Sequence, residues 1–155
     1  GALQRAEPVL RALGTTITHF GPQGAGQAAK ATNQIMVAGI IRANAEALAF
    51  AAAQGLALDK VIGTLGRGAA ANWYLEHRGP NMQRGSYPAG FRVRLHQKDL
   101  NICHEMARSC GAELSVIEAT LADYAQLIAA GHGDEDISAI YRLKAALFAR
   151  ATPAA

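Results

Sequence analysis

The sequence contains little cysteine, and its N-terminus does not have the form of a secretion signal. The two cysteines, Cys103 and Cys110, are seven residues apart, which would separate their Cα atoms by about 10 Å along a helix. A disulfide needs Cα atoms closer than about 7 Å, so we expect two free thiols. The N-terminus has no basic region followed by an apolar run. We therefore expect a reducing, cytoplasmic location.

Long uncharged hydrophobic runs and a strong net charge are also missing. The most apolar segment, 35–53, contains Arg42 and Glu46, and a membrane span tolerates such charges poorly. We therefore expect a buried helix and no membrane partner. The net charge of +3 fits an anionic ligand, but it is too weak to indicate nucleic acid on its own.

Aromatic residues make up only 6% of the chain, whereas hydrophobic residues make up 50%, and alanine is the commonest of them. Because alanine is the best helix former, this composition favours an all-α fold. A chain of 155 residues is long enough for one domain with a sizeable core.

Hydrophobic periodicity and the positions of glycine and proline predict several helices and one strand. Residues 4–13 are typical of a short helix, and 15–20 of a β-strand. The helices expected after them cover about 25–54, 58–65, 70–78, 94–110, 113–130 and 135–150, with a loop at 79–90. The helix at 25–54 would be roughly 45 Å long, so we expect it to reach a partner subunit in an oligomer.

A lone strand has no neighbour with which to pair, and this suggests a domain boundary. We interpret residues 1–22 as the end of an α/β domain whose remainder is absent from the chain. Residues 23–150 would form an all-helical domain, and residues 151–155 a frayed tail.

The first candidate site begins the long helix, in the segment Gly24-x-Gly26-x-x-x-Lys30-x-x-Asn33. Side chains three residues apart on a helix point the same way, so Lys30 and Asn33 can bind one small anion together. The glycines also fit the loose dinucleotide pattern G-x-G-x-x-G/A. A Rossmann turn, however, needs a second strand about thirty residues later, where here the helix continues. We favour a helix N-terminus that approaches an anionic ligand.

Lys30 allows two interpretations. A lysine at a helix edge commonly extends its amine into solvent and has no further function. Asn33, however, is a middling helix former in an alanine-rich stretch, which indicates a function for its amide. A buried lysine beside such a partner can have a lowered pKa and act as a general acid or base.

The second candidate site is Phe91 with the pair Lys98-Asp99. Six basic and two acidic residues lie between positions 67 and 99. This stretch is either a solvated basic face or a patch that meets the phosphates of a cofactor or nucleic acid. His96 and His104 would lie two turns apart without a matching pair of carboxylates, so we expect no metal site.

Together these motifs resemble a known family, the β-hydroxyacid dehydrogenases. The group holds 3-hydroxyisobutyrate dehydrogenase, tartronate semialdehyde reductase (2-hydroxy-3-oxopropionate reductase) and, more distantly, 6-phosphogluconate dehydrogenase. The resemblance rests on Gly24-x-Gly26-x-x-x-Lys30-x-x-Asn33, Phe91 and Lys98-Asp99-Leu100. The neighbouring segments Asn33-Gln34, Ala45-Glu46-Ala47-Leu48 and Pro88-Ala89-Gly90-Phe91 favour the tartronate semialdehyde reductases within the group.

The resemblance implies a fold and a reaction. In this family a Rossmann domain precedes an all-helical domain, and hydride passes between a 3-hydroxy acid or its semialdehyde and NAD or NADP. The family's N-terminal fingerprint is missing here, so the chain resembles a C-terminal half that is inactive alone. Its expected partners are its own Rossmann domain, which would bind most of the cofactor, and further copies in a homo-oligomer.

The family's catalytic and substrate roles would be carried by the first motif. Lys30 would be the acid/base that moves the hydroxyl proton, and Gly26 and Asn33 would hold the substrate. Some relatives have a second asparagine four residues after the lysine, where this chain has Gln34.

The second motif would meet the cofactor. Phe91 would border the nicotinamide, Lys98 would approach the cofactor, and Asp99 would support them. Two other hypotheses stand beside this enzyme: a non-catalytic oligomerisation module derived from the family, and a nucleic-acid-binding protein that uses residues 67–98. The coding sequence upstream of Gly1 would separate the module from the enzyme.

Overall fold

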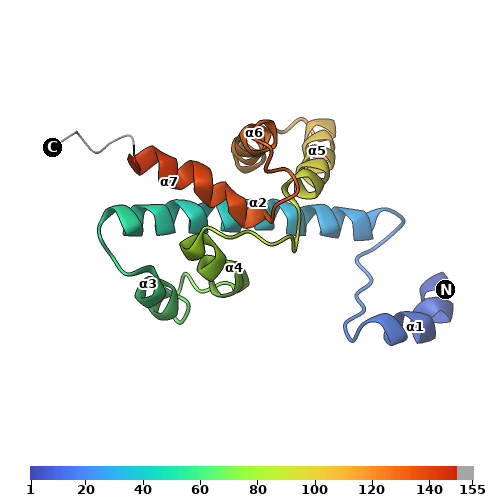
Figure 1. Cartoon of the computed structure of the whole chain (residues 1–155). Helices are drawn as coiled ribbons and strands as arrows, with labels where there is room; N and C mark the ends of the chain where they lie inside the picture. Colours follow the sequence, from blue (N-terminus) through green and yellow to red (C-terminus); the bar gives the residue numbers. More distant parts are fainter. Residues whose placement is uncertain (150–155) are drawn as a thin grey trace.

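The computed structural model describes residues 1–149, where the regular elements are helices joined by loops (Figure 1). The elements are α1 (Ala2–Leu13), α2 (Ala25–Ala53), α3 (Leu58–Leu65), α4 (Trp73–Arg84), α5 (Val93–Ser109), α6 (Ser115–Ala129), the 3-10 turn η1 (Ile137–Ile140) and α7 (Tyr141–Ala149). The prediction of an all-α domain is confirmed. The single helix predicted at 135–150 is divided into η1 and α7, and the tail predicted at 151–155 lies outside the described residues.

The long helix α2 is the element against which the rest of the bundle packs. It contacts α3, α4, α5, α6, η1 and α7, and α7 lies along it (Figure 1). Its 29 residues give a length of about 44 Å, so the predicted long helix is confirmed. Its length and apolarity would also suit a membrane span, but 44% of its most apolar window is buried inside the protein. This burial is typical of the central helix of a bundle.

Two pairs of helices pack on opposite sides of α2. The pair α3 and α4 lies on one side, and the pair α5 and α6 lies on the other (Figure 1). Large side chains from five of these elements and from η1 fill the interior: Ile41, Leu48, Ile62, Leu75, Met82, Leu100, Ile117, Tyr124, Leu127, Ile137 and Ile140. This one core therefore fixes the position of α5 relative to α2.

Four charged side chains form a network among α2, α6 and α7. Nζ of Lys144 lies 2.6 Å from Oδ2 of Asp123 and 3.5 Å from Oε1 of Glu46. Nε of Arg42 lies 2.9 Å from the same Asp123 oxygen. Only 5% of the Lys144 side chain is exposed. Two cations and two carboxylates therefore balance each other, with Lys144 and Asp123 on the buried side and Glu46 and Arg42 toward solvent.

The strand predicted at 15–20 is not formed. These residues lie in the loop between α1 and α2, and no described segment pairs with them. The prediction was wrong because β-propensity alone does not make a strand, which needs a neighbour to share its backbone hydrogen bonds. Helix α1 stands apart from the bundle (Figure 1), and none of its residues is buried. The division of the chain into 1–22 and 23–150 stays a prediction.

The end of α4 also differs from the prediction, which placed a loop at 79–90. The helix continues through Pro80 and ends at Gly85, whose φ of 62° suits glycine. The two prolines and three glycines of 79–90 predicted the loop, but Pro80 only removes one backbone hydrogen bond and is tolerated here. Gly79 lets α4 approach α3 closely, because a Cβ there would lie 3.1 Å from Ile62. The helix therefore continues beyond Pro80, and its close packing against α3 stabilises it there.

Candidate functional site

The facing sides of α2 and α5 place two lysines around one carboxylate. Nζ of Lys30 lies 3.6 Å from Oδ2 of Asp99, and Nζ of Lys98 lies 3.2 Å from Oδ1. Asp99 is 9% exposed, whereas the lysine side chains are 57% and 65% exposed. Each ammonium has three N–H donors, so both can still bind an anionic ligand. The general-acid interpretation assumed a buried lysine, and in this chain Lys30 is more than half exposed.

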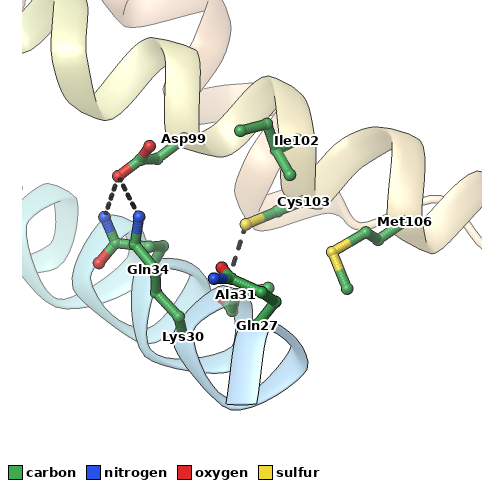
Figure 2. Close-up of a pocket in the computed structure, with 8 residues that line it drawn as sticks. All are labelled: Gln27, Lys30, Ala31, Gln34, Asp99, Ile102, Cys103 and Met106. Atoms are coloured by element: carbon green, nitrogen blue, oxygen red, sulfur yellow. Dashed lines mark hydrogen bonds and ion pairs between the residues drawn. The ribbon is translucent and has the colours of Figure 1, made fainter. Parts of the chain in front are cut away.

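Gln34 and Asn33 extend this cluster along α2. Nε2 of Gln34 donates to Oδ2 of Asp99 over 2.9 Å, and Nδ2 of Asn33 donates to Oε1 of Gln34 over 3.1 Å. Gln34 lies one helical turn after Lys30, so both reach the same carboxylate oxygen (Figure 2). Gln34, a departure from the pattern of some relatives, therefore connects two of the predicted site residues.

Asp99 is negatively charged in these surroundings. Burial alone would raise the pKa of its carboxyl group, but contacts with Lys98, Gln34 and Lys30 outweigh it and hold the pKa below its usual range. Its Oδ1 has no hydrogen-bond partner among the described residues, because Lys98 approaches it without hydrogen-bond geometry. The carboxylate is therefore charged at neutral pH and attracts both lysines.

Phe91 joins the cluster through His96, a fully buried imidazole. The two ring centroids are 5.0 Å apart, and the ring planes are tilted by 39°. Nε2 of His96 lies 3.3 Å from the backbone carbonyl of Gln34, and Nδ1 lies 2.9 Å from the hydroxyl of Tyr124. Burial lowers the pKa of His96 to about 4, so the ring is neutral at pH 7. The contacts of His96 with both Phe91 and Gln34 were not predicted from the sequence. The signal in the sequence was its position three residues before Asp99, which places both side chains on the same face of the helix.

A second carboxylate, Asp136, fixes the backbone of Phe91. Its Oδ2 accepts a hydrogen bond from the N–H of Phe91 over 2.9 Å, and its Oδ1 accepts from the N–H and hydroxyl of Ser138. Nε of Arg78 lies 3.2 Å from Oδ1, and Asp136 is fully buried. A Cβ on Gly90 would overlap the Arg78 guanidinium. This pairing of residues 45 positions apart could not be seen in the sequence.

A small pocket lies between α2 and α5 beside the amine of Lys30 (Figure 2). It is open to solvent, and its empty space, the open mouth included, is about 290 Å³. Its lining combines charged and amide groups with apolar and sulfur side chains: Gln27, Lys30, Ala31, Gln34, Asp99, Ile102, Cys103 and Met106. Both cysteines are free thiols, as predicted, and Cys103 is buried in this lining. Lys30 therefore lines a hollow between α2 and α5.

Asn33 faces a different hollow from Lys30. It lines an open and largely apolar surface with Phe20, Met36 and small residues of α2. Phe20 is 64% exposed and Met36 is 59% exposed. In this chain the lysine and the asparagine are therefore joined through Gln34 and Asp99, but they do not share one pocket.

Gly26 lies outside the cluster, at the start of α2. It does not line the pocket beside Lys30. The N–H groups of Ala25, Gln27 and Ala28 already donate to carbonyls of the preceding turn. Of these first residues, only Gly26 can offer its N–H to a ligand, and anion binding there stays a prediction.

Most cations of the basic stretch 67–98 are paired with carboxylates. The carboxylates are Asp99, which directly follows the stretch, and Asp134 and Asp136, which lie further along the sequence. The paired cations are Arg78, Arg92, Arg94 and Lys98. The stretch therefore carries less free positive charge than its composition indicated, which weakens the nucleic-acid hypothesis.

Fold and cluster together describe a helical domain in which two exposed lysines flank one buried carboxylate and the ring of Phe91 packs against a buried histidine. Residues 24–144 match the family described as the NAD-binding domain of NADP-dependent 3-hydroxyisobutyrate dehydrogenase. The chain belongs to this family, so the resemblance seen in the motifs is confirmed, and NAD(P) is the family's cofactor.

Several characterised proteins are similar to the chain. It is 32% identical to the NAD-dependent L-serine dehydrogenase of Pseudomonas aeruginosa, covering 92% of this chain and 50% of that protein. It is 39% identical to the 2-hydroxy-3-oxopropionate reductase of Escherichia coli, covering 72% of this chain and 38% of the reductase. The crystal structure of 3-hydroxyisobutyrate dehydrogenase from Salmonella typhimurium superposes with a TM-score of 0.83 at 30% identity, covering 92% of this chain and 50% of that one. The chain spans between 38% and 50% of the length of these three proteins and matches their C-terminal half.

Proposed function

We propose that this chain is the substrate-binding and oligomerisation part of an NAD(P)-dependent 3-hydroxyacid dehydrogenase of the 2-hydroxy-3-oxopropionate reductase kind. The observation that carries the proposal is the placement of Lys30 and Lys98 on either side of the buried carboxylate of Asp99. The substrate would be a small 3-hydroxy acid or its semialdehyde, whose carboxylate is attracted by the exposed ammonium groups.

The residues around Asp99 also fit a nicotinamide dinucleotide. Phe91 is half-buried and packs against His96, so one face of its ring is supported and the other can meet a flat heterocycle. The exposed ammonium of Lys98 suits a phosphate or carboxamide oxygen. When bound, NAD(P) supplies or accepts the hydride. A dinucleotide-binding domain would hold most of it, and this chain would border the nicotinamide.

Lys30 would handle the proton that accompanies hydride transfer. Its ammonium form can give a proton to a forming alkoxide, and its amine form can take the proton of a hydroxyl group. Asp99 would hold the Lys30 amine toward the substrate. Asn33 and the N–H of Gly26, which lie outside the pocket beside Lys30, would bind polar groups of the substrate that extend beyond that pocket. Closure of a second domain over the exposed side of Lys30 would exclude water from this step.

The test is turnover by the full-length enzyme with Lys30→Met. We expect kcat for semialdehyde reduction to fall by at least about 100-fold, the usual contribution of a general acid. The oligomeric state, measured by analytical ultracentrifugation, should not change. Lys60→Met, at an exposed position on α3, is the matched control. Near-normal kcat in Lys30→Met would overturn the assignment, whichever 3-hydroxy acid and cofactor the enzyme uses.

A further inference from the structure

We propose that His96 is a positioning residue, whose neutral imidazole sets the ring of Phe91 relative to the turn of α2 that carries Lys30. This inference rests on the proposed function, because it concerns the geometry between the group that would border the nicotinamide and the group that would move the proton. The imidazole touches neither substrate nor cofactor in this proposal. It acts through Phe91 and Gln34.

On the α2 side, two residues of α5 hold Gln34 at two points. Nε2 of His96 lies 3.3 Å from its backbone carbonyl, and the Asp99 carboxylate accepts from its side-chain amide over 2.9 Å. His96 and Asp99 are three residues apart, so they project from the same face of α5. Gln34 follows Lys30 by one turn. The pair on α5 therefore fixes the rotation and depth of the turn that carries the proposed acid/base.

On the other side, His96 supports the ring of Phe91. The backbone of Phe91 is already fixed by its hydrogen bond to Asp136, but that contact leaves the side-chain rotamer free. The packing of the two rings, 5.0 Å between centroids, limits where the phenyl group can lie. One imidazole therefore contacts both halves of the proposed reaction geometry.

The partners of His96 also determine its tautomer. A carbonyl oxygen only accepts hydrogen bonds, so Nε2 must carry the proton that meets Gln34. Nδ1 is then unprotonated and accepts from the hydroxyl of Tyr124 over 2.9 Å. Tyr124 is fully buried on α6, so the imidazole is anchored on three sides. Because the rotamer of the imidazole is locked by these contacts, the ring can hold Phe91 and Gln34 in fixed positions.

The first test is structural and uses this chain alone. Long-range ¹⁵N–¹H NMR spectra distinguish protonated from unprotonated ring nitrogens, and we expect His96 to show protonated Nε2 and bare Nδ1. In His96→Leu, the Phe91 ring signals and the Gln34 side-chain amide should both shift. The matched control is His104→Gln, on the same helix, where the ion-pair contact with Glu118 is lost. An opposite tautomer, or signals of Phe91 and Gln34 that do not move, would overturn the proposal.

The second test is kinetic and uses the full-length enzyme. In His96→Leu we expect kcat to fall about 10- to 100-fold, because small misplacement of reacting groups has effects of this size. The isotope effect measured with 4-deuterated NAD(P)H should rise, and His96→Gln, which keeps an N–H donor, should restore part of kcat. If His96 only filled the core, loss of folded enzyme would lower apparent kcat and leave the isotope effect and KM unchanged. Unchanged values of both would therefore overturn the proposal.

Tyr124→Phe keeps the test decisive if His96→Leu does not fold. This variant retains the ring of Tyr124 but removes the hydroxyl that holds Nδ1, so we expect a smaller fall in kcat together with a raised isotope effect. Wild-type kinetics in Tyr124→Phe with an unfolded His96→Leu would assign the imidazole to folding alone and overturn the proposal. If Lys30→Met is inactive while the His96 and Tyr124 variants behave as wild type, positioning fails and the proposed function stands. Normal turnover in Lys30→Met rejects the proposed function itself.

Discussion

Gln34 and Asp99 lie 65 positions apart in the sequence, and their side chains are joined by a hydrogen bond of 2.9 Å. The same carboxylate oxygen lies 3.6 Å from Nζ of Lys30. One carboxylate oxygen of Asp99 on α5 therefore contacts both the amide of Gln34 and the amine of Lys30, which are one turn apart on α2. This contact couples the packing of the two helices to the placement of the lysine amine.

Replacing Asp99 with asparagine should weaken the fold and the site together. The substitution removes the negative charge and leaves two ammonium groups without a counter-ion. Because the lysines are largely exposed, we expect the free energy of unfolding to fall by only roughly 1 kcal/mol at pH 7. The pKa of Asp99 is lowered in the folded chain, so its contribution is present above the unfolded pKa and is lost as the pH falls through the folded value.

Urea unfolding at pH 7 and at pH 3 measures this effect. The difference between wild type and Asp99→Asn should shrink in acid, because the unfolded wild type then binds a proton on Asp99 more readily than the folded chain does. Glu105→Gln, at an exposed position on the same helix, is the control and should have little effect at either pH. A difference that is the same at both values would show that charge has no part in the contribution of Asp99.

The buried imidazole of His96 should make the protein less stable in mild acid. The pKa of His96 is about 4 in the folded chain and 6.5 for the unperturbed side chain, so between these values the unfolded chain binds the proton more readily. Stability is therefore unaffected above pH 6.5 and declines as the pH falls from 6.5 to 4, by up to about 3 kcal/mol. The facing groups are the hydroxyl of Tyr124 and the carboxylate of Asp99, and the latter opposes the shift.

Unfolding free energies measured at pH 7, 6 and 5 test this prediction. The glutamine side chain in His96→Gln does not bind a proton in this pH range. The free energy of unfolding of this variant should therefore depend less steeply on pH than that of the wild type, whatever its size at pH 7. His19→Gln, at an exposed position, should keep the wild-type slope. Parallel curves for wild type and His96→Gln would contradict the prediction.

Much of the bundle could be predicted from local sequence. The helix α2 follows from alanine content and periodicity, and the joint placement of Lys30 and Lys98 was expected from the family resemblance. The contacts that hold the site could not be predicted, because they join distant segments. Gln34 meets Asp99, and Asp136 meets Phe91, only once the helices have packed.

Local signals also failed where tertiary packing outweighs propensity. The prolines and glycines of 79–90 predicted a loop, yet α4 continues through Pro80 to Arg84, where Gly79 packs closely against Ile62. Residues 15–20 have β-propensity but lie in a loop of this chain. Helix α4 contacts α3, whereas residues 15–20 have no described strand with which to pair. In both cases the local structure depends on another part of the fold.

Gly90→Ala should disturb the loop that carries Phe91. The new methyl group would overlap the Arg78 guanidinium and lie 3.0 Å from Oδ2 of Asp136. Arg78 would have to leave a fully buried carboxylate, so we expect unfolding free energy to fall by about 1–3 kcal/mol. Gly63→Ala in α3 is the control, because a Cβ there meets nothing within 4 Å.

The control should change stability in the opposite direction. Alanine is favoured over glycine inside a helix by up to about 1 kcal/mol, so Gly63→Ala should be neutral or stabilising. Thermal and urea unfolding of both variants give the comparison. If Gly90→Ala is as stable as Gly63→Ala, the loop does not depend on the pairing of Arg78 with Asp136.

Lys144→Met should show the cost of removing one cation from a buried carboxylate. The Lys144 ammonium is 2.6 Å from Asp123, and among the described residues its removal leaves that carboxylate paired with Arg42. We expect a loss of about 2 kcal/mol, less than for a carboxylate left with no partner. The double variant Lys144→Met with Asp123→Leu should lose less than the sum of the single variants, since it removes both charges. Lys60→Met, at an exposed position, measures the effect of losing a solvated lysine. Additive losses in the double variant, measured by urea unfolding, would show that the two charges are not coupled.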